Sequence, residues 1–240
     1  MMTKNTFLTE DERRARYRVV SVRLRERYGT PTWRPHLPPV DELVCTILSQ
    51  NTNDVNRDRG FERLRAAFPT WEAVRDAPTA QVIEAIRPAG LANQKAPRIQ
   101  SALRHLSDTQ GSITLDHLAD MPLDAARAWL VSMDGVGPKT AAIVLLFAFG
   151  RPAFPVDTHV LRVSKRLGLL APKTSAERAH VEMEKIVPGE DFYAFHLNMI
   201  EHGRMLCHAR RAPMCAQCPL STQCSYYAEN TPDAGAADDV

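Results

Sequence analysis

The sequence contains no long hydrophobic segment. Its longest apolar run, residues 141–149, has nine residues, whereas a helix that crosses a bilayer needs ~20. Residues 1–14 are polar and lack the apolar stretch of a secretory signal peptide. These absences predict a cytoplasmic protein without membrane contact, associated with the nucleoid if the source is bacterial. The apolar run fits a buried helix.

Strand-like alternation of apolar and polar residues is also missing. Apolar residues instead recur every three or four positions in nearly every segment, which is typical of amphipathic helices. Thr9 and Glu12 suggest a capping box for a first helix that Gly29 would end. The sequence therefore predicts an all-α fold of many short helices. Later helices are expected over residues 158–167, 175–186 and 192–206.

The net charge is small, at +2. However, four acidic residues follow the last cysteine, so the chain ahead of them carries a formal charge of +6. A polyanionic partner is therefore permitted, although a solvated mixed surface explains the same charge. The acidic residues are Glu229, Asp233, Asp238 and Asp239.

Cysteines are few, yet four of the five lie within 18 residues, in the pattern C-x7-C-x2-C-x5-C. Cytosolic cysteines stay reduced, and four in a short span predict a metal site. Zinc also binds four cysteines, but usually as two close pairs, whereas this pattern has one pair and two singles. The four are Cys207, Cys215, Cys218 and Cys224. The fifth, Cys45, lies on an apolar helix face and is expected to be a small buried side chain.

A glycine-rich turn occupies residues 133–141, Met-Asp-Gly-Val-Gly-Pro-Lys-Thr-Ala. Gly135 and Gly137 allow a tight turn between two helices, and Pro138 suits the first position of the second helix. Free backbone N–H groups at such a turn bind phosphate without reading base sequence. Gly135, Val136, Gly137 and Thr140 are therefore candidate DNA-binding residues.

Two charged residues follow from this turn. Lys139 lies in the first turn of the second helix, where the helix dipole favours a neutral, nucleophilic amine. Asp157 lies eighteen residues later and is a natural helix N-cap. Taken singly, Lys139 also suits plain phosphate binding and Asp157 suits capping alone.

Together the two motifs resemble a known family. Gly-Val-Gly-Pro-Lys-Thr-Ala followed by Val-Asp-Thr-His-Val is similar to the helix-hairpin-helix and catalytic aspartate of the endonuclease III family, with matching element order over residues 10–225. The resemblance implies that Lys139 is a nucleophile and Asp157 the catalytic carboxylate. Mismatch adenine glycosylases of the same fold lack this lysine.

The resemblance also implies two all-α domains with a DNA-binding cleft between them. We expect a six-helix domain with the hairpin over residues 39–146, an iron–sulfur domain from residues 1–38 and 147–228, and a disordered acidic tail over 229–240. The implied activity is a base-excision glycosylase that removes oxidised pyrimidines and cleaves the abasic strand by β-elimination through a lysine Schiff base. The base must leave the stack first.

The cysteine pattern resembles the [4Fe–4S] loop of this family, so Cys207, Cys215, Cys218 and Cys224 are the expected cluster ligands. The family spacing begins with x6, whereas this chain has x7, which puts the path of the loop in question. Arg210 and Arg211 lie in this loop and are candidates for phosphate contacts, although solvated arginines fit equally.

Two further segments resemble the loops that open the duplex. An amide side chain, Gln50 or Asn51, would fill the gap left by a flipped base, and Leu91 would be the apolar wedge on the opposite strand. Helix ends and caps explain the amides as well. Ala89 is smaller than the residue expected beside the wedge, and Asp134 replaces a common proline beside the hairpin.

Three hypotheses remain at this point. The first is the bifunctional glycosylase and lyase, acting as a monomer on double-stranded DNA with damaged bases or abasic sites. The second is a mismatch-type glycosylase with weak lyase activity. The third is a non-catalytic DNA-docking protein, against which the Lys139 and Asp157 pair argues.

Overall fold

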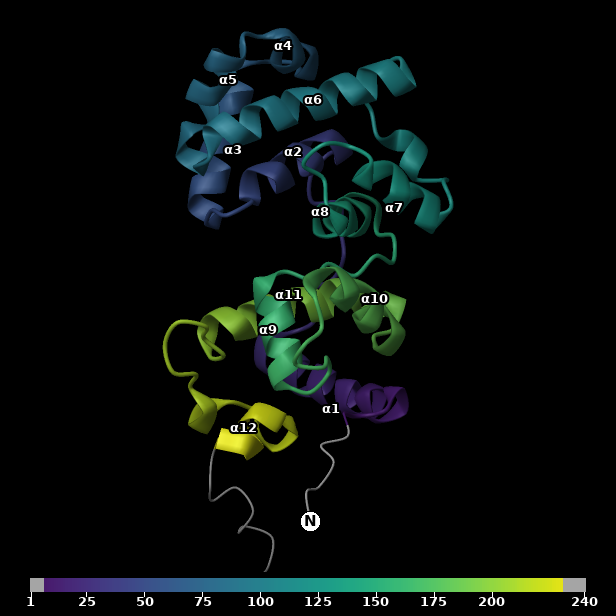
Figure 1. Cartoon of the computed structure of the whole chain (residues 1–240), viewed down its shortest axis with the longest axis vertical. Coiled ribbons are helices and arrows are strands. Elements are labelled where there is room, and N and C mark those ends of the chain that lie inside the picture. Colours follow the sequence, from purple (N-terminus) through teal and green to yellow (C-terminus); the bar gives the residue numbers. More distant parts are fainter. Residues whose placement is uncertain (1–6, 231–240) are drawn as a thin grey trace, which may run out of the picture. The chain divides into compact units, whose positions relative to one another are not determined.

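The computed structural model describes residues 7–230, and these form helices joined by turns, with no β-strand among them (Figure 1). The predicted all-α fold is confirmed. The helices are α1 (Glu10–Tyr28), α2 (Pro39–Ser49), α3 (Asp54–Ala67), α4 (Trp71–Asp76), α5 (Thr79–Ile86), α6 (Ala92–Gln110), α7 (Leu123–Val131), α8 (Pro138–Ile143), α9 (Thr158–Arg166), α10 (Ala176–Ile186), α11 (Phe192–Met205) and α12 (Ser225–Asn230). Shorter helical turns are η1 (Arg87–Ala89), η2 (Asp116–Leu118), η3 (Val144–Ala148), η4 (Gly189–Asp191), η5 (Cys215–Gln217) and η6 (Ser221–Gln223).

The chain divides into two compact units. Arg34–Arg151 forms one unit, which carries α2 to α8 and is called the inner unit because it is an internal segment of the sequence. The described residues before Arg34 and after Arg151 form the outer unit, which carries α1 and α9 to α12. The outer unit is therefore built from two separate stretches of the chain.

The core of the inner unit lies around α2 and α6. The α6 helix packs against α2, α4 and α5, and Figure 1 shows it as the long helix of this unit. Its apolar residues at helical spacing, Ile99, Leu103 and Leu106, are fully buried. The α2 helix is buried around most of its circumference, including Cys45 as expected. Burying such side chains contributes about 1.5–3 kcal/mol each.

A close approach in the inner unit explains one small residue. A Cβ built on Gly60, in α3, would lie 2.9 Å from the Cβ of Ala89, in η1. Ala89 itself has no exposed surface. Its side chain therefore faces the core of the unit, and a larger residue there would push η1 away from α3.

The outer unit joins α1 to α10 and α11. The expected capping box begins α1: the Thr9 N–H donates to Glu12 Oε2 at 2.7 Å, and the Glu12 N–H donates to Thr9 Oγ1 at 3.3 Å. Gly29 ends the helix with a φ of +84°. Tyr17 packs edge-on against Phe195 of α11, with ring centroids 5.0 Å apart.

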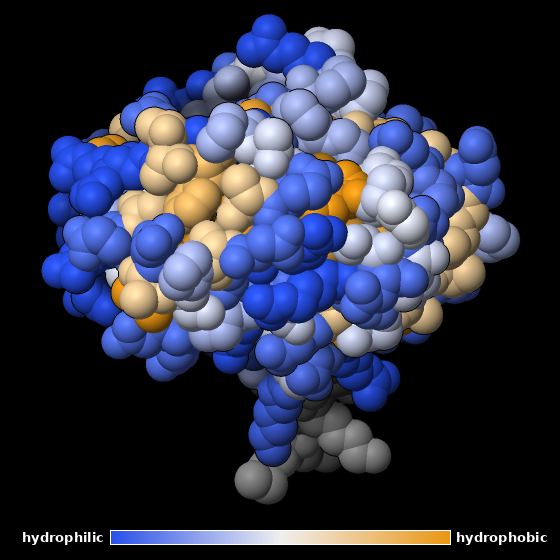
Figure 2. Space-filling model, turned by 90° about the horizontal axis from the view of Figure 1, so that it is seen from above, coloured by the Kyte–Doolittle hydropathy of each residue, from blue (hydrophilic) through white to orange (hydrophobic). Residues whose placement is uncertain are grey.

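Three other expectations bear on the outer unit and the surface. The helices predicted over residues 158–167, 175–186 and 192–206 are α9, α10 and α11. The predicted tail starts two residues too early, because Glu229 and Asn230 belong to α12, and residues 231–240 lie outside the described part. No helix of the described chain is long and apolar enough to cross a membrane. On the face seen in Figure 2, hydrophilic residues predominate.

Candidate active site and cysteine cluster

The glycine-rich turn forms a helical hairpin in the inner unit. The α7 helix ends at Val131, and α8 begins at Pro138, with Gly137 as its extended N-cap residue. The turn is closed by the Val136 N–H, which donates to the Met133 carbonyl at 3.1 Å. An open depression follows this turn, lined by residues 131–137 and by Arg98.

Gly135 is required at the tip of the hairpin. Its φ is +77°, a region that favours glycine, and a Cβ there would lie 2.6 Å from Arg98 Cδ. The hydrocarbon stem of Arg98, from α6, therefore packs directly beneath the hairpin backbone. Arg98 and Asp134 both line the depression.

Lys139 is the second residue of α8 and is half-buried. No residue of the described chain forms a hydrogen bond or ion pair with its ammonium group. Thr140, beside it, is buried, so the helix start is fixed while the lysine side chain stays available.

Asp157 is the N-cap of α9 in the outer unit. Its Oδ1 accepts a hydrogen bond from the Val160 N–H at 2.7 Å, so the expected cap is confirmed. Within residues 7–230, Oδ2 has no hydrogen-bond donor. The hydrogen bond of Oδ1 therefore fixes the orientation of the side chain.

The two candidate amides differ in their surroundings. Gln50 is half-buried, and its Nε2 donates to the Gly135 carbonyl at 3.1 Å, so it ties the end of α2 to the hairpin. Asn51 is exposed and has a φ of +53°. The structure thus gives the two neighbouring amides different environments. The sequence alone could not distinguish them.

The candidate wedge stands at the start of α6. Leu91 is 46% exposed, although it directly precedes a helix whose apolar face is buried. Its φ is +49°, and the preceding Gly90 has a φ of +67°. Asn51 and Leu91 are the only non-glycine residues of the described chain with positive φ.

The four cysteines of the outer unit line one small cavity of about 20 Å³. All four are free thiols. Arg166 Nη1 donates to Cys207 Sγ at 3.1 Å, and Cys218 Sγ lies 3.6 Å from His202 Nε2. Burial raises the pKa of the Cys218 thiol to about 11, so a thiolate there needs a cation beside it. No three ligand-type side chains in residues 7–230 are spaced to hold a single ion.

The loop between the first two cysteines accommodates its extra residue. The Met214 N–H donates to the Leu206 carbonyl at 2.9 Å, which closes the loop next to Cys207 and Cys215. Pro213 and Met214 of this loop line the cavity, whereas Arg210 and Arg211 are exposed.

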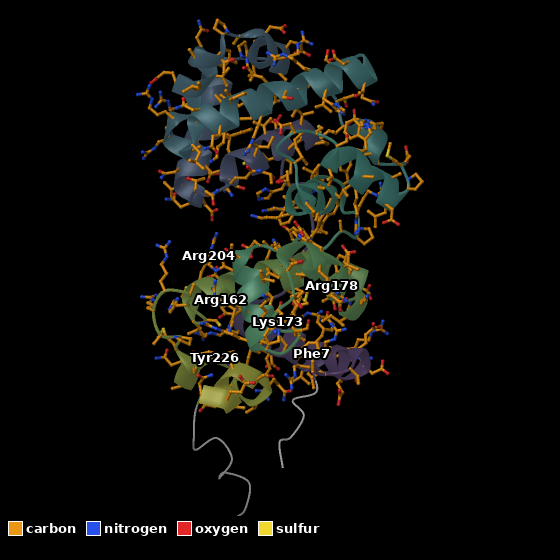
Figure 3. The ribbon with its side chains drawn as sticks, in the orientation of Figure 1. Phe7, Arg162, Lys173, Arg178, Arg204 and Tyr226 are labelled. Atoms are coloured by element: carbon orange, nitrogen blue, oxygen red, sulfur yellow. The ribbon has the colours of Figure 1, made fainter. Side chains whose placement is uncertain are left out.

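Basic residues of α9 hold the cysteine loop in place. Arg162, labelled in Figure 3, donates through Nη2 to the Cys207 and Gly203 carbonyls at 2.9 and 3.0 Å. The Arg166 guanidinium lies 4.7 Å from the ring centroid of Tyr226, also labelled there. A positive charge beside the cavity favours thiolates over thiols.

Sequence reasoning assigned no role to Lys95, Arg98 or the α9 arginines. Lys95 is 1% exposed and donates to the carbonyls of Leu48 and Ala89. A signal for Lys95 existed, because it shares the helical spacing of Ile99 on the apolar stripe of α6. A lysine at a core position needs acceptors, whereas the role of Arg98 depends on packing between distant segments.

The chain is similar to known base-excision proteins. Residues 44–189 match the HhH-GPD superfamily base excision DNA repair protein family. Endonuclease III of Sulfolobus acidocaldarius is 33% identical over 190 residues, which cover 78% of this chain and 82% of that protein. The chain belongs to the endonuclease III family. It is an endonuclease III-like DNA glycosylase of base excision repair.

Two further family comparisons agree. A relative from Arabidopsis thaliana is 33% identical over 172 residues, and this chain spans only 59% of its length. A solved structure of a trapped endonuclease III–DNA covalent intermediate is 31% identical, with a TM-score of 0.78. The two structures align over 92% of this chain and 98% of the endonuclease III chain.

Proposed function

We propose that this family member is a bifunctional enzyme that removes oxidised pyrimidines from duplex DNA and then cleaves the abasic strand. The observation that carries the proposal is Lys139, a half-buried lysine without an internal partner, directly after the hairpin. A protein that only binds DNA needs the hairpin, but it does not need the amine of Lys139 or the carboxylate of Asp157. The trapped covalent complex of a 31% identical relative adds support.

The hairpin and the exposed loops are suited to hold and open DNA. Backbone N–H groups of Gly135 to Gly137 would bind a phosphate without reading sequence. Asn51 would fill the gap left by the extruded base, because Gln50 is already bound to the hairpin. The exposed Leu91 would unstack the opposite strand.

The chemistry requires one amine and one carboxylate. As the neutral Lys139 amine bonds to C1′ of the sugar, the bond from C1′ to the base breaks, and the base leaves with a proton. Asp157 stabilises the positive charge that develops on the sugar and assists proton transfer. The sugar ring then opens to an iminium ion, a proton is lost from C2′, and the 3′ phosphate departs. Water finally releases Lys139.

We propose that the four cysteines hold a [4Fe–4S] cluster. The donor set fits, because four free thiols line one cavity beside the Arg166 guanidinium. When bound, the cluster would supply iron–thiolate bonds that fix the loop carrying Arg210 and Arg211. No step of base removal is assigned to it.

Borohydride trapping tests the catalytic proposal. Wild type is incubated with duplexes that contain thymine glycol or an abasic site, beside Lys139→Gln and the control Lys173→Gln, an exposed lysine of the outer unit. We expect covalent adducts on both duplexes for wild type and control, and none for Lys139→Gln. Trapping on the abasic site alone would retain the lyase and exclude this base as substrate. No adduct with intact DNA binding would favour a monofunctional or docking role.

Metal analysis tests the cluster. We expect about four iron atoms and four sulfides per chain in protein purified without oxygen, with visible absorption that disappears in Cys218→Ser. About one zinc per chain and no iron would exclude the cluster.

A further inference from the structure

Lys95 is a buried cation that the chemistry of base removal does not use. It lies in the first turn of α6, is 1% exposed, and shares the buried face of that helix with Ile99. No carboxylate of the described chain pairs with it, and burial lowers its pKa to about 8. A buried charge without an opposite charge opposes folding, so its contribution has to come from the groups that it binds.

The ammonium group binds two carbonyls from separate segments. Lys95 Nζ donates to the Leu48 carbonyl at 2.7 Å and to the Ala89 carbonyl at 2.8 Å. Leu48 lies in the last turn of α2, where carbonyls lack partners within the helix. Ala89 is the last residue of η1. The Lys95 side chain therefore connects the end of α2 to the end of η1, through carbonyls that are 41 residues apart in sequence.

Each carbonyl that Lys95 binds precedes, by two or three residues, a residue with a strained positive φ. Asn51 follows Leu48 by three residues, and Leu91 follows Ala89 by two, and these are the only non-glycine residues with positive φ in residues 7–230. Left-handed backbone is costly for such residues and persists only where the surroundings impose it. The ammonium of Lys95 is a fixed point shared by both turns.

We infer that Lys95 is a positioning residue that sets Asn51 and Leu91 together for opening the duplex. The inference rests on the proposed function, in which these two residues enter the DNA from the damaged and the opposite strand. Lys95 touches no DNA. It acts by fixing the spacing and backbone shape of the two turns before the DNA arrives, so that binding need not order them.

Gln100 provides a matched control within the same helix. It is also 1% exposed, and its Nε2 donates to three carbonyls, of Val74 at 3.0 Å, Arg75 at 3.4 Å and Ala77 at 2.8 Å. These carbonyls belong to α4 and to Ala77 directly after it, a segment that carries neither Asn51 nor Leu91. Gln100→Leu therefore removes a buried donor of similar standing from the same helix without loosening the two strained turns.

The test compares wild type, Lys95→Met and Gln100→Leu on two duplexes. One is undamaged, and the other contains a tetrahydrofuran abasic analogue opposite 2-aminopurine. We expect Lys95→Met to keep its affinity for undamaged DNA within about twofold and to lose ~tenfold of its preference for the tetrahydrofuran duplex, equivalent to about 1.4 kcal/mol. The 2-aminopurine fluorescence rise on binding should be lost as well. Gln100→Leu should keep both the preference and the fluorescence rise.

The other outcomes are equally decisive. An unchanged preference and fluorescence rise in folded Lys95→Met would overturn the role of Lys95 while leaving the proposed function intact. Equal losses in Gln100→Leu would reduce Lys95 to a general structural residue. If wild type itself shows no preference for the tetrahydrofuran duplex, both the inference and the proposed function fail. Should Lys95→Met not fold, Lys95→Gln, which keeps a donor on a shorter side chain, takes its place with the same expected direction.

Discussion

Asp157 serves two purposes that a pair of substitutions can separate. Its Oδ1 caps α9, whereas Oδ2 has no donor within the described chain. Asparagine is as good an N-cap as aspartate. The free energy of unfolding of Asp157→Asn should therefore lie within about 0.5 kcal/mol of the wild-type value. Its base-excision rate should nevertheless fall about 10²- to 10⁴-fold.

Asp157→Ala completes the comparison. It should lose the same activity and, because the cap is gone, about 1 kcal/mol of stability as well. Thermal unfolding and single-turnover excision measure the two properties separately. Full activity in Asp157→Asn would show that the carboxylate is only a cap.

Glu42 links the core of the inner unit to pH. It is 5% exposed, and burial raises its pKa to about 7. An unfolded glutamate ionises near pH 4.5, so between these values the folded chain binds more protons than the unfolded chain. The free energy of unfolding should therefore fall as the pH rises through this window, by about 3 kcal/mol.

Glu42→Gln tests the assignment. The substitution removes the titration but keeps a hydrogen-bonding side chain beside Thr46. Urea unfolding at pH 5 and pH 8 should show a smaller pH dependence for the variant than for wild type. The same slope in both proteins would place the titrating group elsewhere.

At the scale of elements, the hairpin depends on the helix beneath it. Gly135→Ala introduces a methyl group 2.6 Å from Arg98 Cδ and a strained φ. We expect a loss of about 1–3 kcal/mol in stability and weaker DNA binding. Adding Arg98→Ala should return only part of the stability, because it relieves the clash but not the backbone strain. Full recovery in the double variant, measured by thermal unfolding, would mean that φ contributes nothing.

The elements also show how far sequence reasoning reaches. Helices α9, α10 and α11 were predictable because their apolar spacing and their caps at Asp157 and Ser175 are local signals. The hairpin was predictable for the same reason, since two glycines and a proline dictate its backbone. The cysteines were recognisable as one set because their spacing is short.

Contacts between distant segments were not predictable. The sequence could not divide Gln50 from Asn51, because the difference is a hydrogen bond from Gln50 to Gly135, 85 residues away. The packing of Ala89 was not predictable for the same reason: its partner is Gly60, across the packing of two elements. Lys95 shows the same limit, since its acceptors are backbone carbonyls, which carry no trace in the sequence.

At the scale of the whole molecule, binding of duplex DNA should depend on salt through exposed arginines. If Arg210 and Arg211 each contact a phosphate, replacing both with alanine should reduce the slope of log affinity against log salt by about 2. Arg178→Ala, which removes an exposed arginine from α10, is the control. Titrations between 50 and 200 mM salt, as suggested by counterion release, measure the slope. No difference from Arg178→Ala would make the loop arginines plain solvated charges.

The path of the chain has a consequence for synthesis. Because α1 packs against α10 and α11, its apolar residues Tyr17, Val20 and Leu24 lack their partners while the whole of Arg34–Arg151 leaves the ribosome. At typical elongation rates this interval is on the order of 10 s. The nascent chain therefore exposes these apolar side chains of α1 throughout translation of the inner unit. Chaperone demand should fall when α1 is moved behind α11 by circular permutation.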